Sequence, residues 1–335
     1  RGPEFIALLN KVTDQFKQIF QTKNDLFILT GSGTGGLEAA AVNMLSPEDK
    51  VLSVSIGVFG ERWAQIAQTF GAEVVPLRFE WGKPADPDAI RKALEADSSI
   101  KAVMVTHNET STGVTNDLKA ISAAVKEYDK LLLVDAISSL GSLELPVDEW
   151  HCDIAISGSQ KGWMVPPGLA MVSVSPQAWK AYEKASMPRF YWDFGKAKSY
   201  LEKGQTPWTP AVSTFFGLEV SLDMMLKEGT TRIIARHARV GKAAREGAKN
   251  IGLALFADEA HASNTVTAVA GTNGLDTKKL TKIMREEHDV VLAGGQGKLD
   301  GKIFRIGHLG LVTEDDIAKV ITALKVALPK AGFQN

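Results

Sequence analysis

Two polar residues stand directly after apolar runs, and their types define a chemistry that the chain can perform. Lys161 follows the run Ile154–Ile156 through a Ser/Gly-rich turn, and Asp135 ends the run Leu131–Val134. Such continuous apolar runs are typical of strands in a parallel sheet that is buried on both faces. Open α/β sheets bind ligands at the carboxyl ends of these strands. A lysine for a Schiff base and an aspartate for a pyridinium nitrogen are what pyridoxal phosphate chemistry requires.

Both residues also have a purely structural interpretation. Most lysines are solvated surface charges, and Asp135 has the position of a helix N-cap because Ser138 and Ser139 follow it. A buried Lys161 would instead have a pKa lowered toward neutrality, which makes its amine nucleophilic. An ionised Asp135 would keep a ring nitrogen protonated, and each pKa unit of that stabilisation is worth about 1.4 kcal/mol.

A glycine-rich segment, Gly31–Gly36, follows one predicted strand and opens a predicted helix. Its N–H groups, with the hydroxyls of Ser32 and Thr34, can hold a phosphate at the positive end of that helix. The same G-x-G-x-x-G pattern opens dinucleotide folds, but these need an acidic residue where this chain has Ser55–Gly57. A P-loop is excluded because no Gly-Lys-Ser/Thr follows. The segment therefore predicts phosphate binding, with a structural turn as the alternative.

Three further residues each allow a structural or a functional interpretation. Phe59 follows the second predicted strand, where it can stack on a cofactor ring or fill the core under the next helix. Arg305 lies inside an apolar strand, where its charge needs an anionic partner. That partner is a substrate carboxylate, which suits a bidentate guanidinium, or a structural salt bridge. We interpret His107 as a structural, hydrogen-bonded histidine.

Composition excludes several classes of protein. The chain has 335 residues and a net charge of −1, which gives no indication of nucleic acid or of an acidic membrane surface as partner. Its length suggests about two domains. A single cysteine, Cys152, excludes an intrachain disulfide and any Cys-x-x-Cys site. No apolar stretch reaches the ~20 residues of a spanning helix, and no signal peptide is visible. These features fit a reducing cytoplasm.

Strands and helices alternate through the first two-thirds of the chain, which predicts a mostly parallel sheet covered on both faces. Strands are expected at 26–29, 51–55, 74–75, 102–105, 131–135, 154–157 and 169–174, and helices at 37–45, 61–70 and 118–128. The aromatic segment Arg189–Pro210 reads as irregular and packed against another part of the protein.

The last third of the chain predicts a second domain. Long helices are expected from about residue 215 to 249. The tail then predicts strands at 266–269, 290–293 and 303–306 and helices at 277–287 and 314–328. We therefore expect a large domain of residues 1–228 and a smaller C-terminal α+β domain of residues 229–335.

Taken together, these segments resemble the class V, fold-type I pyridoxal-phosphate aminotransferases, in the alanine/serine–glyoxylate branch. The resemblance covers Phe5–Leu328, and its segments agree in order and spacing. The segments that carry it are Leu131–Leu140, Ser157–Gly162, Thr106–Gly113, Gly31–Ala39 and Phe304–Gly310. It implies a large domain with a mostly parallel seven-stranded sheet, a smaller C-terminal α+β domain and pyridoxal 5′-phosphate (PLP) as the cofactor.

The resemblance also implies roles for individual residues. Lys161 would form the Schiff base with PLP and move the proton at the substrate Cα. Asp135 would pair with the ring nitrogen, and Ile137 would pack under the ring. Phe59 has the place of a stacking aromatic, and Ser111 would contact the cofactor near its ring.

The remaining roles concern the phosphate and the substrate. Arg305 would bind the substrate α-carboxylate. The phosphate would be held by Ser32, Gly33, Thr34 and Gln160. Thr206 and Thr209 would reach the phosphate of the partner subunit, so that only a homodimer has a complete site, although the family often has a tyrosine near the place of Thr206. The family also begins with a Gly-Pro-rich segment that lines the substrate pocket, and we expect this sequence to start after it.

The implied reaction is a ping-pong transamination from serine or alanine to glyoxylate or pyruvate. Because Arg305 is the one evident carboxylate clamp, small monocarboxylates are favoured over aspartate or glutamate. A PLP-dependent lyase or desulfurase is an alternative, for which Cys152 is poorly placed. Some relatives are labelled soluble hydrogenase small subunit; one cysteine cannot ligate a nickel–iron or iron–sulfur centre, so that label would describe a partner role or a misassignment. A nicotinamide-dependent oxidoreductase is weakened by the missing acid near Ser55.

Overall fold

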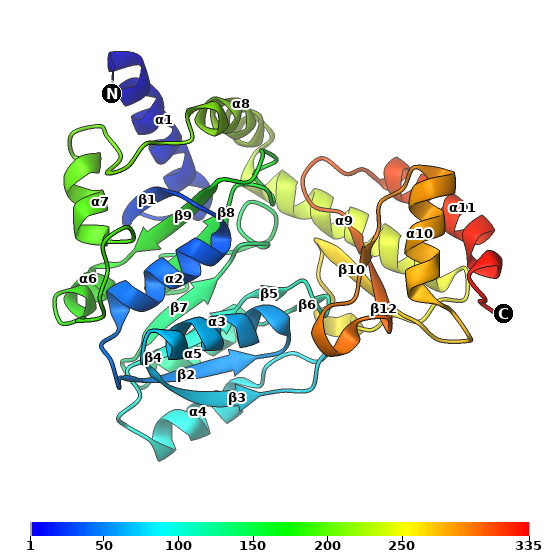
Figure 1. Ribbon diagram of the computed structural model, residues 1–335, viewed down its shortest axis with the longest axis horizontal. Helices are drawn as coiled ribbons and strands as arrows, with labels where there is room; N and C mark the ends of the chain where they lie inside the picture. The colour runs from blue at the N-terminus through cyan, green and yellow to red at the C-terminus, as the bar shows by residue number, and fades with distance from the viewer. Residues whose placement is uncertain (1, 335) are drawn as a thin grey trace.

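Residues 2–334 are described in a computed structural model, in which a large and a small part lie side by side (Figure 1). The large part contains a seven-stranded sheet of order β1-β9-β8-β7-β4-β2-β3. Its strands are Asp25–Thr30 (β1), Lys50–Ser55 (β2), Glu73–Arg78 (β3), Ala102–Thr106 (β4), Leu131–Asp135 (β7), Ile154–Gly158 (β8) and Leu169–Val174 (β9). Only β9 pairs antiparallel with its neighbours, β1 and β8. The predicted mostly parallel, seven-stranded sheet is confirmed.

Helices form most of the connections between the parallel strands, whereas residues 136–153, which connect β7 to β8, contain no helix. The connecting helices are Gly33–Met44 (α2), Val58–Thr69 (α3), Pro87–Ala96 (α4) and Leu118–Lys126 (α5). Every residue of β4, β7, β8 and β9 is buried. This burial on both faces explains why these strands read as unbroken apolar runs in the sequence.

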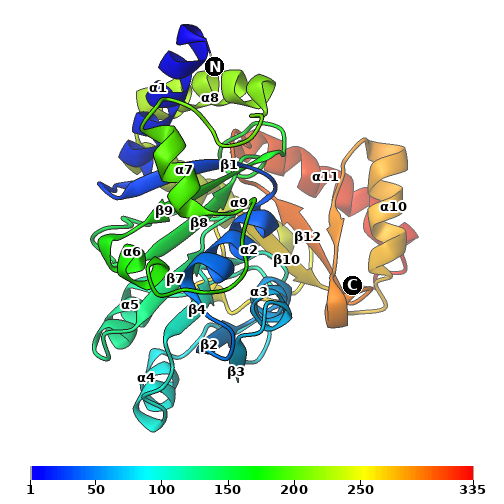
Figure 2. The ribbon, with the colours of Figure 1, turned by 60° about the vertical axis from the view of Figure 1, so that its left-hand side comes forward.

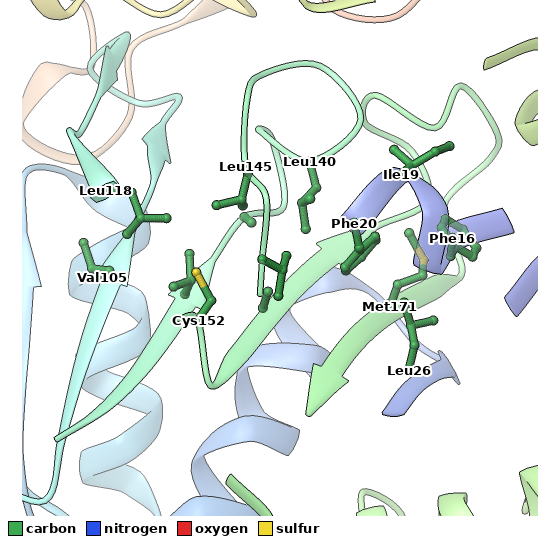
Figure 3. Close-up of a cluster of buried hydrophobic side chains, with 14 of the residues drawn as sticks. Phe16, Ile19, Phe20, Leu26, Val105, Leu118, Leu140, Leu145, Cys152 and Met171 are labelled. Carbon is green, nitrogen blue, oxygen red and sulfur yellow. The ribbon is translucent and has the colours of Figure 1, made fainter. Parts of the chain in front are cut away.

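Successive side chains of each strand enter opposite helical layers. In β7, Leu132 and Val134 face a core that includes α4 and α5, whereas Leu131 and Leu133 face a core that includes α2 and α3. Helices that complete these layers are Pro3–Phe20 (α1), Pro176–Tyr182 (α6), Phe194–Leu201 (α7) and Val212–Glu228 (α8). Figure 3 shows the first core, which is the one that includes α4 and α5; there the side chains of α1 lie near Met171 of β9.

The small part has its own sheet and its own core. Its strands, Val266–Ala270 (β10), Ile303–Gly307 (β12) and Ala293–Gly294 (β11), pair antiparallel in that order. Helices Thr230–Lys249 (α9), Thr277–His288 (α10) and Glu314–Lys330 (α11) share its apolar core. In both views, α10 and α11 lie on the side away from the large sheet (Figure 1, Figure 2). This separate core supports our proposal of a domain boundary at residue 229.

Some expectations from the sequence differ from the structure, and one helix named here was not expected. The segment Arg189–Pro210 is not irregular throughout, because it contains α7, which the side chain of Asp193 caps by accepting from the N–H of Lys196. Helix α4, with Asp86 as its N-cap, was not expected. The strand predicted at 290–293 is reduced to the two residues of β11, and Val291 is 70% exposed. Within residues 2–334, no helix has the length and apolar character needed to cross a membrane.

A short hairpin brings the small part against the large sheet. The hairpin consists of Asn108–Glu109 (β5) and Val114–Thr115 (β6), and it follows β4 directly. The carbonyl of Gly113 accepts a hydrogen bond from Ser263 N–H at 2.8 Å. This bond joins the small part to the hairpin that follows β4.

Candidate functional site

One cavity of about 130 Å³ opens at the carboxyl ends of the parallel strands. It unites side chains that are far apart in the sequence, and they come from the segments that follow β1, β2, β4, β7 and β8. The residues predicted for a site that line it are Ser32, Gly33, Thr34, Phe59, Asp135, Ile137, Gln160 and Lys161. The sheet therefore brings the predicted lysine, aspartate and phosphate loop together.

Asp135 is the last residue of β7 and is buried. Its Oδ1 accepts a hydrogen bond from Ile137 N–H at 3.0 Å, but no helix begins there, so it is not a helix N-cap. Burial raises the pKa of Asp135 to about 7, although the Ile137 N–H and the charge of Lys161 oppose the shift. A buried carboxylate in this condition gains most from a cation placed against it. A protonated pyridine nitrogen is such a cation.

Lys161 lies in the turn after β8 and is half-buried. Burial lowers the pKa of its amine, and the charge of Arg305 lowers it further, while Asp135 raises it. The solvated-surface interpretation therefore does not apply. A larger share of this amine is neutral, and so nucleophilic, at neutral pH than for an ordinary lysine.

The glycine segment begins α2 earlier than the sequence predicted, at Gly33. Gly36 N–H donates to the carbonyl of Ser32, so the preceding N–H groups of this first turn have no intrahelical acceptor. A Cβ on Gly33 would lie 2.5 Å from Cδ1 of Ile137, and one on Gly35 would lie 2.7 Å from Trp192. Close packing thus explains the glycines, and the N–H groups without an intrahelical acceptor leave a place for a phosphate.

Phe59 lies in the first turn of α3 and lines the cavity. The guanidinium of Arg62 lies 4.8 Å from the centroid of its ring and also lines the cavity. No ion pair of Arg62 occurs among residues 2–334. The cavity lining therefore contains a positively charged side chain, Arg62, that the sequence analysis did not predict.

Arg305 on β12 is buried and points at the hairpin rather than at an acid. Its Nε donates to the carbonyl of Gly294 at 3.0 Å, and its Nη1 donates to the carbonyl of Thr110 at 2.9 Å. Among the described residues no carboxylate lies within ion-pair distance of it. The structural salt bridge is thus not observed. Thr110 lines the cavity, whereas Arg305, which the sequence predicted for the site, does not line it itself.

Some predicted site residues lie outside this cavity. Ser111 is fully buried, where its hydroxyl donates to Glu109 at 2.6 Å and accepts from Val58 N–H at 3.0 Å. Thr206 donates to the carbonyl of Trp208 in its own chain at 2.7 Å. Thr209 is exposed, and only its carbonyl is used, by the hydroxyl of Thr30. None of the three lines the cavity formed by this single chain.

The cavity also contains residues that the sequence did not single out. They are Leu37, Arg62, Asn108, Thr110 and Ser138. Asn108 donates to the hydroxyls of Ser138 at 2.8 Å and Thr265 at 2.9 Å, and so joins the two parts of the protein. Asn108 and Ser138 follow β4 and β7, so the strand-end rule that selected Asp135 could have found them.

His107 and Cys152 do not contribute to the cavity. His107 is buried against Trp150 at a ring-centroid distance of 6.2 Å, and burial lowers its pKa to about 4, which fits a structural role. Its buried Nδ1 has no hydrogen-bond partner among the described residues, so the hydrogen-bonded histidine that the sequence predicted is not observed. Cys152 is buried in the first core (Figure 3). Burial raises the pKa of its thiol. A desulfurase would need this cysteine at the cavity, on a mobile loop.

Comparisons with known proteins agree with this geometry. A family model described as aminotransferase class-V matches residues 1–299. The chain is 47% identical to the soluble hydrogenase 42 kDa subunit of Anabaena cylindrica, over 100% of this chain and 88% of that protein. It is 38% identical to serine–glyoxylate aminotransferase of Methylorubrum extorquens, over 100% of this chain and 86% of that protein. The solved structure of pyridoxamine–pyruvate aminotransferase from Mesorhizobium loti superposes with a TM-score of 0.94, at 34% identity, over 99% of this chain and 86% of that chain.

Proposed function

The chain belongs to the class V aminotransferases, and from that premise we propose that it transfers the amino group of serine or alanine to glyoxylate or pyruvate. Enzymes of this family depend on PLP. The observation that carries the proposal is that Lys161 and Asp135 line one cavity together with the open first turn of α2. These are the groups needed for the aldehyde, the ring nitrogen and the phosphate of PLP.

The residues of the cavity fit the cofactor by their chemistry. The N–H groups at the start of α2 and the side chains of Ser32, Thr34 and Gln160 would hold the phosphate. Ile137 and Phe59 would cover the faces of the ring. When bound, PLP supplies an aldehyde that captures amino groups and a ring that withdraws electrons from the substrate Cα.

The protein supplies proton transfer, orientation and charge. Asp135 holds a proton at the ring nitrogen because its buried carboxylate is stabilised by a cation there. The amine of Lys161, with its lowered pKa, takes the proton from the substrate Cα and later returns one, as a general base and acid. Arg305 binds the α-carboxylate of the substrate, and its two backbone hydrogen bonds fix the direction of the guanidinium.

The amino donor follows less directly from the site. The similarity to serine–glyoxylate aminotransferase supports serine and glyoxylate. Arg62 lines the cavity and adds a guanidinium to that of Arg305 on β12, so the number of arginines no longer argues against a dicarboxylate donor such as aspartate. Aspartate therefore belongs among the donors that are tested.

We further propose that the enzyme is a homodimer in which Thr206 and Thr209 approach the phosphate of the partner subunit. The side chains that line the phosphate end of the cavity are neutral in this chain, so additional donors would strengthen phosphate binding. Helix α8 begins at Val212, three residues after Thr209, and exposes an apolar stripe of Phe216, Val220 and Met224, which supports an interface there. A free, buried Cys152 supports a reducing, cytoplasmic location.

The experiment is a donor screen of the purified, PLP-loaded protein. Serine, alanine and aspartate are each mixed with glyoxylate or pyruvate, and the amino acid formed is identified by mass spectrometry. We expect glycine from serine and glyoxylate in wild type and none in Lys161→Ala. Failure of every pair would favour the alternative suggested by the Anabaena relative's name, a role as a subunit of a soluble hydrogenase.

A further inference from the structure

A second carboxylate lies beside the cavity, and the proposed chemistry does not use it. Glu109 belongs to β5 and its side chain is completely buried. Its Oε2 accepts hydrogen bonds from Phe59 N–H at 3.0 Å and Gly60 N–H at 3.2 Å. Its Oε1 accepts from Ser111 N–H at 3.1 Å and from the Ser111 hydroxyl at 2.6 Å. All four partners are donors, which suits an ionised carboxylate.

The place of Glu109 in the fold is as specific as its contacts. The carboxylate lies at the N-terminus of α3, where the helix dipole favours a negative charge. Gly57 makes room for it, because a Cβ there would lie 2.5 Å from Cδ of Glu109. Glu109 thus joins the hairpin after β4 to the first turn of α3, which carries Phe59.

The charge of Glu109 also reaches two other groups of the site. It raises the pKa of Asp135 and opposes the lowering of the pKa of Arg305. Burial raises the pKa of Glu109 itself, and its four hydrogen bonds oppose that shift. Burying a charged side chain costs free energy that an apolar side chain in the core would not cost, which favours a specific role for Glu109.

We propose that Glu109 is a positioning residue of the active site, whose buried carboxylate fixes the main chain at Phe59 and so holds the Phe59 ring against the cofactor. This inference rests on the proposed function, because the ring that Phe59 covers is that of PLP. Glu109 acts through Phe59 rather than on the substrate, since its oxygens are used by main-chain and serine donors.

The first test uses the protein without cofactor. In Glu109→Gln, an NH₂ group replaces one of the two acceptor oxygens and faces hydrogen-bond donors. The hydrogen bonds from Phe59 and Gly60, or those from Ser111, are therefore lost. We expect the amides of Phe59 and Gly60 to exchange with deuterium about tenfold to a hundredfold faster than in wild type. Glu61→Gln is the matched control, because Glu61 is an exposed acid in the first turn of the same helix. Equal exchange in wild type and Glu109→Gln would overturn the proposal.

The second test separates positioning from general stability. PLP affinity is measured by titrating apo-protein, for wild type, Glu109→Gln, Phe59→Ala and the double variant. We expect Glu109→Gln to raise the Kd for PLP about tenfold when Phe59 is present and less than about twofold when residue 59 is alanine. Equal effects in both backgrounds would show that Glu109 does not act through the Phe59 ring.

The two tests distinguish a failure of the proposed function from a failure of the inference about Glu109. A wild type that binds no PLP refutes the proposed function, while the exchange experiment still tests the anchoring by Glu109. If Glu109→Gln does not fold, Ser111→Ala replaces it, because it removes the hydroxyl that joins Glu109 to Val58 N–H. Ser111→Ala should then accelerate exchange at Phe59 by about threefold to tenfold, and unchanged exchange would contradict the inference.

Discussion

The cofactor-free protein should be destabilised by its own aspartate, and the destabilisation should grow with pH. Burial raises the pKa of Asp135 from 3.8 to about 7. Between these values the folded state holds a proton that the unfolded state has released, so the free energy of unfolding falls as pH rises. A shift of roughly three units at about 1.4 kcal/mol each gives about 4 kcal/mol at most, reached above pH 7.

The variant that exposes this effect is Asp135→Asn. The amide has nearly the same shape, can still accept from Ile137 N–H and carries no charge. We expect apo Asp135→Asn to be more stable than apo wild type by up to about 4 kcal/mol at pH 8, with the difference vanishing near pH 4. The same variant should lose at least about a hundredfold in transamination rate, because nothing then holds the proton at the ring nitrogen.

Urea unfolding of both apo-proteins from pH 4 to pH 8 measures this difference. Asp14→Asn serves as the control, because Asp14 is an exposed acid of α1 remote from the cavity. A difference between Asp135→Asn and wild type that does not change with pH would refute the reasoning. An Asn variant that is less stable than wild type at pH 8 would refute it too.

Three further predictions follow from contacts around the cavity. Gly33→Ala should raise the Kd for PLP about tenfold, because the new Cβ meets Cδ1 of Ile137. Adding Ile137→Ala to that variant should restore much of the affinity. If the affinity does not recover, the clash with Ile137 is not the cause of the loss. Arg305→Lys should lower kcat/KM for the amino donor about a hundredfold and leave the Kd for PLP within about twofold, because a lysine cannot reproduce the two-pronged guanidinium. An equal loss of kcat/KM and of PLP affinity would show that Arg305 binds the cofactor. Cys152→Ala should leave the turnover number within about twofold and lower the free energy of unfolding in urea by about 1 kcal/mol. Loss of turnover would show that Cys152 takes part in the reaction.

The sequence predicted the centre of the fold well for a physical reason. Strands β7 and β8 are buried on both faces, so their apolar runs are unbroken and the polar residues that end them are conspicuous. Helix α7 was missed because its aromatic surroundings obscured a good N-cap at Asp193. The two-residue strand β11 is defined by its pairing with β12 rather than by its own side chains, and no local pattern reports such pairing.

The periphery of the site was harder to predict because it depends on tertiary contacts. Thr110 and Ser111 are adjacent hydroxyl residues in one loop, and the sequence does not tell which of them faces the cavity. The structure turns Ser111 toward Glu109 and leaves Thr110 at the cavity wall. The roles proposed for Thr206 and Thr209 require a second subunit, and in the single chain Thr206 bonds to the carbonyl of Trp208 instead.

The most direct test of the central claim is the attachment of PLP to Lys161. Purified protein is loaded with PLP, its visible spectrum is recorded, and borohydride is added before digestion and mass spectrometry. We predict a visible band that borohydride abolishes and a phosphopyridoxyl group on the peptide that contains Lys161, both missing in Lys161→Ala. A colourless protein that PLP does not reconstitute, or a label on another lysine, would contradict the account.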